Sequence, residues 1–173
     1  MSEYLVITTS LRTDSLSRKL AALALADYRA LGVAVEAIDL REFPLPHCDG
    51  EAAYADPNVG KLAARIQAAR VVVIATPIYN YDANSAAKNL VELTGKAWED
   101  KTVGFLCAAG GGGSYMSIMG LANSLMLDFR CLIIPRFVYA TGDDCTADGA
   151  PKSAIEKRIR QFAESTLAIR NAV

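Results

Sequence analysis

VVVIATPIYNY, residues 71–81, is the stretch that decides the fold. Its first part, residues 71–76, is continuously apolar, which is typical of a strand buried on both faces at the centre of a parallel sheet. Pro77 is expected to end the strand, because proline cannot donate a hydrogen bond to a neighbouring strand. An aromatic, amide-bearing turn follows at residues 78–81. The stretch therefore predicts a central strand whose carboxyl end carries unusual side chains.

On both sides of this strand, apolar runs alternate with stretches of helical periodicity. Five β–α units in succession require a parallel sheet with helices on both faces. Right-handed crossovers and five strands favour the strand order 2-1-3-4-5. The sequence therefore predicts a three-layer α/β protein in which residues 1–173 form a single domain. We expect strands over 4–9, 33–40, 71–76, 102–109 and 131–140, and helices over 15–32, 58–69, 84–95, 114–128 and 153–171.

Composition and charge argue against several classes of function. The 173 residues carry a formal net charge of −1, and the basic residues are not clustered as nucleic-acid binding requires. No apolar run approaches the roughly 20 residues of a membrane-spanning helix, and the N-terminal residues lack the pattern of a signal peptide. We therefore expect a cytoplasmic protein with neither nucleic acid nor membrane as a partner.

The cysteines and the histidine argue against metal and triad chemistry. Four cysteines are too widely spaced for a CxxC pair or for zinc ligands, and we expect them to be reduced. A zinc site or a Ser-His-Asp triad would depend on the single histidine, His47. We therefore expect no metal site.

The loop after the first strand reads TTSLRTDSLSRKL, residues 8–20. A helix start offers unpaired backbone N–H groups and a partial positive charge, so it attracts a phosphate. Serine hydroxyls add donors, and an arginine can bind the dianion through two parallel hydrogen bonds. A serine N-cap beside one solvated arginine would give the same pattern. The candidate phosphate ligands are Ser10, Arg12, Ser15, Leu16 and Ser17.

Two further loops are expected at the same edge of the sheet. The turn after the central strand can lie along a flat ring, although it could equally pack on the next helix or on another subunit. Four consecutive glycines follow the fourth strand and let backbone approach a ligand closely, or they form a flexible connection. The candidates are Pro77, Ile78, Tyr79, Asn80 and Tyr81 in the turn, and Gly110, Gly111, Gly112 and Gly113 in the glycine loop. A phosphate attached to a planar polar ring fits all three loops, and FMN has that shape.

The sequence resembles the NADPH-dependent FMN reductase family of the flavodoxin-like superfamily over roughly residues 4–140. SLRTDSLSRKL at 10–20 and TPIYNYDANSAAKNLVEL at 76–93 carry the resemblance, and GGGGSYMSIMGLANSLMLDF at 110–129 supports it. The resemblance implies that the first loop holds the FMN phosphate, that residues 77–81 line the isoalloxazine, and that residues 110–113 face its pyrimidine side. Thr9 replaces a glycine that is usual in the family, and Ile78 stands where many relatives carry glutamate.

By this resemblance, hydride passes from NADH or NADPH to FMN and onward to a quinone, a free flavin or another small acceptor. The flavin performs the redox chemistry, so we expect no catalytic side chain. Two alternatives stay open: a flavin reductase that supplies reduced FMN to a monooxygenase, and a flavin electron carrier or redox sensor without nicotinamide turnover. The near-neutral charge argues against a carrier, and a flavodoxin-like scaffold that has lost flavin is a third possibility.

Two further expectations concern packing. Residues 114–127, SYMSIMGLANSLML, are apolar nearly all round, which suits a helix covered on its second side by another subunit. We therefore expect a homodimer or a homotetramer. Trp98, in KAWEDK, is expected to anchor a surface loop.

Overall fold

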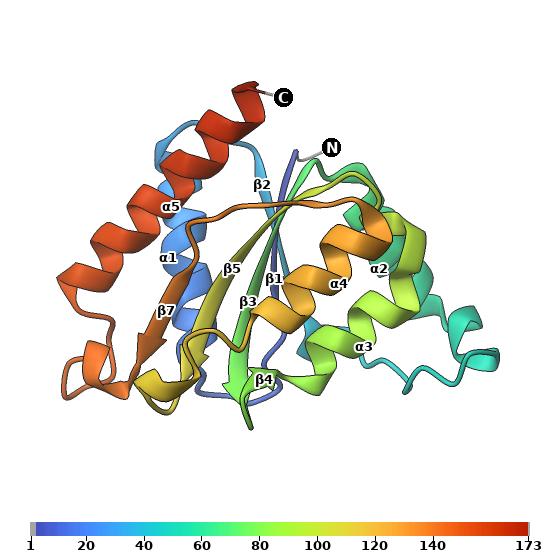
Figure 1. Ribbon diagram of the computed structural model, residues 1–173, viewed down its shortest axis with the longest axis horizontal. Helices are drawn as coiled ribbons and strands as arrows, with labels where there is room; N and C mark the ends of the chain where they lie inside the picture. Colours follow the sequence, from blue (N-terminus) through green and yellow to red (C-terminus); the bar gives the residue numbers. More distant parts are fainter. Residues whose placement is uncertain (1–2, 173) are drawn as a thin grey trace.

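A parallel β-sheet runs between two layers of helices in the computed structural model, which describes residues 3–172 (Figure 1). The strands follow the order β2-β1-β3-β5-β6, and β7 also pairs with β5. Since β5 is the fourth main strand and β6 and β7 together occupy the fifth position, the predicted fold class and the order 2-1-3-4-5 are confirmed. The main strands are β1 (Tyr4–Thr8), β2 (Val35–Asp39), β3 (Val71–Tyr79), β5 (Thr102–Ala109), β6 (Leu132–Ile133) and β7 (Val138–Thr141).

The strand count differs from the prediction, because the sheet has seven strands rather than five. The outermost strand is broken. Val103 pairs with Ile133 and Leu106 pairs with Val138, so the outer segment contains more residues than the part of β5 that lies beside it. Pro135 lies in this break and has no N–H to donate to a ladder. The predicted single strand over 131–140 is therefore two short ones.

The second additional strand is β4. It shows that β3 continues past Pro77, although the sequence predicts that Pro77 ends the strand. β3 continues to Tyr79, and β4 (Asp82–Ala83) pairs with its last two residues in antiparallel fashion. The turn after the central strand is thus the tip of a β-hairpin.

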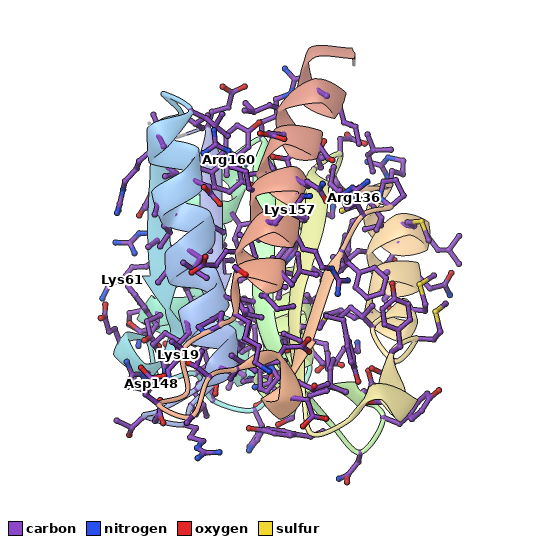
Figure 2. The ribbon with its side chains drawn as sticks, turned by 90° about the vertical axis from the view of Figure 1, so that its left-hand side faces the viewer. Lys19, Lys61, Arg136, Asp148, Lys157 and Arg160 are labelled. Atoms are coloured by element: carbon purple, nitrogen blue, oxygen red, sulfur yellow. The ribbon has the colours of Figure 1, made fainter. Side chains whose placement is uncertain are left out.

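Five helices cover the sheet. Helices α1 and α5 lie side by side on one face, and α2, α3 and α4 cover the other (Figures 1 and 2). A buried hydrogen bond of 3.0 Å between the hydroxyls of Tyr28 and Thr166 joins α1 to α5. The helix bounds are α1 (Leu16–Ala30), α2 (Pro57–Ala68), α3 (Ser85–Thr94), α4 (Met119–Phe129) and α5 (Ser153–Ala172). Helix α4 begins later than predicted, because Gly112–Ser114 forms a separate 3-10 turn.

The core consists of two clusters that the sheet separates. Alternate residues of the central strands face opposite sides: Val72 and Ile74 pack under α2, α3 and α4, whereas Val71 and Val73 pack under α1 and α5. This explains the continuously apolar sequence of β3, since both of its faces are covered.

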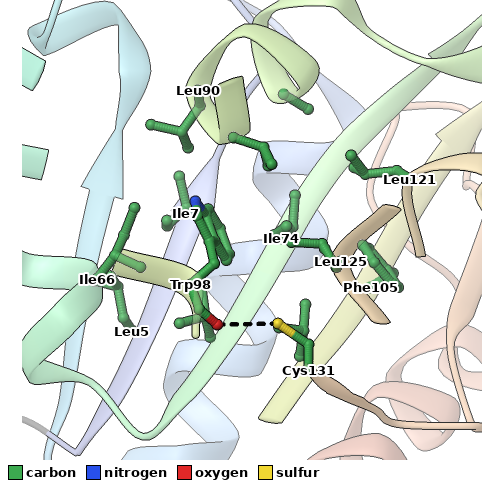
Figure 3. Close-up of a cluster of buried hydrophobic side chains, with 14 of the residues drawn as sticks. Leu5, Ile7, Ile66, Ile74, Leu90, Trp98, Phe105, Leu121, Leu125 and Cys131 are labelled. Carbon is green, nitrogen blue, oxygen red and sulfur yellow. Dashed lines mark hydrogen bonds between the residues drawn. The ribbon is translucent and has the colours of Figure 1, made fainter. Parts of the chain in front are cut away.

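Trp98, which the sequence predicts to anchor a surface loop, ends the 3-10 turn η3 (Gly95–Trp98) between α3 and β5, and its side chain belongs to this core. Its side chain is fully buried in the cluster under α2 and α4 (Figure 3). The indole N–H donates to the Thr94 hydroxyl at 2.7 Å, so the ring is buried without an unsatisfied donor. The thiol of Cys131 donates to the backbone carbonyl of Trp98 at 3.1 Å.

All four cysteines are free thiols. Burial raises the pKa of Cys107 to about 12, so this thiol stays protonated and unreactive near neutral pH. Within residues 3–172, no helix is both long and apolar enough to cross a bilayer.

Candidate functional site

A cleft of about 780 Å³ opens at the carboxyl ends of β1, β3 and β5, at the lower edge of the sheet in Figure 1. This is the edge at which ligands bind in open α/β sheets, next to the point where the strand order reverses. The volume lies within the range of roughly 300–1,000 Å³ that is usual for ligand pockets. Its lining is Arg12, Ser15, Leu16, Pro77, Ile78, Tyr79, Asn80, Tyr81, Ala108, Ala109, Gly110, Gly111 and Ser114.

All three predicted loops thus contribute to one cleft. Of the predicted residues, Ser10, Ser17, Gly112 and Gly113 are not part of its lining. Ser10 and Ser17 are buried directly behind the first loop. The sequence did not single out Ala108, Ala109 or Ser114, which carry no chemical signal of their own.

The first loop carries unpaired backbone donors, and Ser15 among them lines the cleft. Within the described chain, the backbone N–H groups of Leu11, Thr13, Asp14 and Ser15 have no acceptor. Ser15 precedes α1 at the N-cap position but does not cap it, because its hydroxyl bonds to the Ser17 hydroxyl at 2.8 Å. Free N–H groups at a helix start are the donors that an anion needs.

Arg12 is the exposed cation of this loop, and its guanidinium makes no ion pair or hydrogen bond within residues 3–172. Asp14, the acid beside it, is paired with Lys19 at 3.1 Å. The loop therefore offers an unpaired guanidinium and unpaired N–H groups, and its one carboxylate has a cation of its own.

Arg18 organises the loop from behind, a role that the sequence analysis missed. Its guanidinium donates to the backbone carbonyls of Ser10, Arg12 and Thr13 at 2.7–2.9 Å. It also pairs with Asp39 at the end of β2, at 3.0 Å. Arg18 thus satisfies three carbonyls of this loop, while the N–H groups named above have no acceptor within the described chain.

Asp39 is fixed as an anion behind the same loop. Partial burial raises the pKa of Asp39, but hydrogen bonds from Arg41 and Arg18 outweigh this effect and lower the pKa to about 2. The Arg18–Asp39 pair is therefore intact throughout the neutral range.

Asn84 joins the first loop to the second. Its carboxamide oxygen accepts from the hydroxyls of Thr9, at 2.8 Å, and Thr76, at 3.0 Å, and its amide donates to the Thr9 carbonyl at 2.9 Å. Asn84 also caps α3 by accepting from the N–H of Ala87. Thr9, which replaces a family glycine, therefore makes a buried link between β1 and the start of α3.

The second loop is a tight turn in an unusual conformation. Asn80 and Tyr81 both have positive φ, at 50° and 67°, as the two central residues of a type I′ hairpin require. Asparagine tolerates this region, but a tyrosine there is strained, and such strain concentrates at functional sites. The side chains of Tyr79 and Tyr81 are exposed at the cleft, whereas Ile78 packs into the core.

The third loop is open to close approach from outside. A Cβ atom placed on any of Gly110–Gly113 meets nothing within 4 Å, and none of these glycines has a positive φ. Neither packing within the chain nor backbone conformation therefore requires glycine here. The Tyr139 hydroxyl holds the loop by donating to the Gly111 carbonyl, and it lies 2.7 Å from the Ser114 hydroxyl.

This arrangement fits FMN. The first loop offers an anion site, the hairpin turn offers an aromatic wall, and the glycine loop leaves room for a flat ring against bare backbone. Residues 3–172 contain no cluster of three His, Cys, Asp or Glu side chains that could bind a metal ion. The cleft is thus suited to hold an organic phosphate with a planar ring.

Comparison with known proteins agrees with this chemistry. The model of the NADPH-dependent FMN reductase family matches residues 3–144. An NAD(P)H-dependent FAD/FMN reductase of Geobacillus thermodenitrificans (strain NG80-2) is 29% identical over 114 residues, which are 64% of this chain and 61% of the relative. The match thus spans about three fifths of that relative's length.

Two solved structures share the fold. RosB with the bound intermediate 8-demethyl-8-formylriboflavin-5′-phosphate superposes with a TM-score of 0.77 at 20% identity, over 98% of this chain and 80% of RosB. FerB, the flavoenzyme NAD(P)H:(acceptor) oxidoreductase of Paracoccus denitrificans, gives a TM-score of 0.76 at 23% identity, over 95% of this chain and 94% of FerB. Because the family model covers most of the chain, the protein belongs to the NADPH-dependent FMN reductase family.

Proposed function

We propose that this protein is an NAD(P)H-dependent FMN or quinone reductase. It transfers hydride from a reduced nicotinamide to FMN and passes the electrons on to a small acceptor, a quinone or a flavin. The observation that carries the proposal is the meeting of three loops in one cleft: a loop of unpaired N–H groups with Arg12, a strained tyrosine turn and an open glycine loop. Membership of the family supports the same activity.

In this proposal, the chain binds and orients while the flavin reacts. The first loop, with Ser10, Arg12 and Ser15 to Ser17, holds the phosphate. Residues 77–81 and 110–113 hold the ring system. Bound FMN supplies a site that accepts two electrons and one proton as a hydride and later releases them. The open cleft lets a nicotinamide stack on the ring in reacting orientation.

Replacing Arg12 tests the phosphate site. We expect Arg12→Ala to weaken FMN binding about tenfold to a hundredfold, because a charge-assisted hydrogen bond to the phosphate is lost. Riboflavin, which lacks the phosphate, should bind both proteins equally. Fluorescence titration with each flavin measures the two affinities. An unchanged FMN affinity would remove Arg12 from the site.

Anaerobic stopped-flow mixing tests the activity. The FMN-loaded protein should lose its flavin absorbance on mixing with NADPH or NADH, and a quinone should restore it. If neither nucleotide bleaches the flavin within minutes, the protein is a carrier or sensor and the reductase proposal fails. Reduced flavin that leaves the protein before an acceptor is added would instead indicate a supplier of reduced FMN to a monooxygenase.

We further propose that the whole chain, 1–173, is one flavin-binding domain that works as a homodimer or homotetramer in the cytoplasm. The outer face of α4 supports the assembly, because Met119 and Leu127 are 44% and 77% exposed there. The four free thiols suit a reducing compartment. Limited proteolysis, light scattering and cell fractionation test these three statements.

A further inference from the structure

A second groove, of about 580 Å³, lies beside α5 and has no role in the site described above. Its lining comes from the chain segment between β6 and β7, from α5 and from Tyr115. In Figure 2, Arg136 lies in the space between α5 and α4, where this segment runs. The groove is lined by Tyr115, Ile134, Pro135, Arg136, Phe137, Arg158, Ser165, Ala168 and Ile169.

Two arginines in this lining have only neutral partners. Arg158 is half-buried and donates to the Tyr139 carbonyl at 3.3 Å, and Arg136 donates to the Gln161 carboxamide oxygen at 3.1 Å. Within residues 3–172, neither arginine forms an ion pair with a carboxylate, and no Asp or Glu lines the groove. By contrast, Arg160 on the same helix pairs with both Asp27 and Glu164. The groove therefore carries two positive charges that no carboxylate in its lining neutralises.

The groove also has an aromatic wall. The rings of Tyr115 and Phe137 lie 4.9 Å apart between centroids at an angle of 34°, and the Tyr115 side chain is 44% exposed. An aromatic face of this kind offers stacking to a purine, and two guanidinium groups beside it offer hydrogen bonds to phosphates. Together, they suit a nucleotide with an extra phosphate better than a purely apolar ligand.

The groove adjoins the flavin cleft through a shared wall. Ser114 lines the cleft, and Tyr115, the next residue, lines the groove. Between them, the Tyr139 hydroxyl bonds to Ser114 and Gly111, and the Tyr139 carbonyl accepts from Arg158. From Arg158 to Ile169, α5 runs along the groove for roughly 16 Å, at 1.5 Å per residue. A dinucleotide whose nicotinamide lies in the cleft can thus extend along α5.

We propose that this groove binds the adenosine 2′-phosphate half of NADPH and makes NADPH the preferred electron donor. This inference rests on the proposed reductase function. Arg136 and Arg158 bind the 2′-phosphate, and the Tyr115–Phe137 wall receives the adenine. NADH lacks the 2′-phosphate and gains less from the two arginines.

The test is the double variant Arg136→Gln/Arg158→Gln, with Lys157→Gln as the matched control. Lys157 is an exposed cation on the same helix, and it does not line the groove (Figure 2). We expect the double variant to raise the KM for NADPH about tenfold to a hundredfold. The kcat, the affinity for FMN and the KM for NADH should change little. The control should behave like the unmodified protein.

A binding measurement gives a second readout that needs no turnover. Adenosine 2′,5′-bisphosphate should bind the unmodified protein more tightly than 5′-AMP in calorimetry, and the double variant should lose this difference. The single variant Arg136→Gln, at an exposed position, provides the same comparison if the double variant folds poorly.

The outcomes separate this inference from the proposed function. If NADPH bleaches the flavin but its KM is the same in both proteins, the groove inference is overturned while the reductase stands. Equal binding of the two adenosine nucleotides by the unmodified protein also overturns it. A double variant that changes only the oligomeric state would assign the groove to a contact between copies of the chain. If neither NADPH nor NADH bleaches the flavin, the reductase itself fails.

Discussion

Arg18 fixes the conformation of the first loop at the scale of a single residue. Its three hydrogen bonds satisfy the carbonyls of Ser10, Arg12 and Thr13 and tie the loop to the first turn of α1. We therefore propose Arg18 as a positioning residue, which acts through the loop on the phosphate that the loop is proposed to bind. Asp39 holds the guanidinium in place, because the pair is half-buried and charged at neutral pH.

We expect Arg18→Gln to weaken FMN binding about tenfold, because the loop loses the group that binds three of its carbonyls and fixes its conformation. Riboflavin binding should fall much less, since the loop faces only the phosphate. Parallel fluorescence titrations with the two flavins check this. If both affinities fell equally, Arg18 would support the fold in general and not the phosphate loop. Lys61→Gln, at an exposed position of α2, is a control that should change neither affinity.

The sequence could suggest the serines and Arg12, but not the residues that hold them. Phosphate-binding patterns are local, and residues 10–17 show theirs within a few positions. Arg18 acts through Asp39, and Asn84 through Thr9, so each depends on a partner far along the chain. The full burial of Trp98 depends on distant contacts in the same way, because the short polar stretch around it gives no sign of the core that encloses the ring.

Gly104 and Phe162 show how two elements constrain each other. Gly104 lies in the middle of β5, and a Cβ atom there would come within 2.5 Å of the Phe162 ring on α5. Phe162 is fully buried, so the ring cannot turn outward. This strand therefore needs glycine for the close approach of α5 and not for a special backbone conformation.

We expect Gly104→Ala to destabilise the protein by about 1–3 kcal/mol, the usual cost of overpacking a core. Chemical denaturation of both proteins measures the loss. Adding Phe162→Leu should recover part of it, because the smaller side chain makes room for the new methyl group, and neighbouring sites couple in this way. Phe162→Leu alone should be destabilising. If Gly104→Ala were neutral, β5 and α5 would have to separate more easily than the packing indicates.

At the scale of elements, long patterns were predictable and short pairings were not. The apolar runs of β3 and β5 identify buried strands, since both faces are covered. The two-residue strands β4 and β6 exist only because a longer strand pairs with them, and their own sequence carries no period. The sequence accordingly predicts a turn at Asn80 and Tyr81, but it does not predict that β3 extends to this turn and forms a hairpin with β4.

At the scale of the whole molecule, the outer face of α4 remains uncovered. Met116, Met119, Met126 and Leu127 are 53%, 44%, 38% and 77% exposed on or just before this helix. A cluster of exposed apolar side chains of this kind marks an interaction surface. A second copy of the chain is the occupant we expect, because a two-fold contact would place the same face on both subunits.

The N-terminal end of α4 also lies near the hairpin of β3 and β4, whose turn is formed by Asn80 and Tyr81. A Cβ atom on Gly120 would come within 3.9 Å of the Asp82 carboxylate, so β4 and α4 are neighbours. A partner that covers α4 would therefore stand close to the exposed rings of Tyr79 and Tyr81. Assembly and flavin binding should then be linked, since the partner would shield one side of the turn.

We expect Leu127→Glu to convert the proposed dimer into a monomer, because a charge placed at the most exposed apolar position of α4 cannot be buried without a partner charge. Sedimentation velocity measures the assembly. The control is Tyr54→Glu, which places the same charge at an exposed aromatic residue outside α4 and should leave the assembly intact. The monomer should bind FMN more weakly, because no partner then shields one side of the tyrosine turn. If the unmodified protein sediments as a monomer, or if Leu127→Glu stays dimeric, then α4 is not the subunit contact, and the tyrosine turn must bind flavin without help from a second chain.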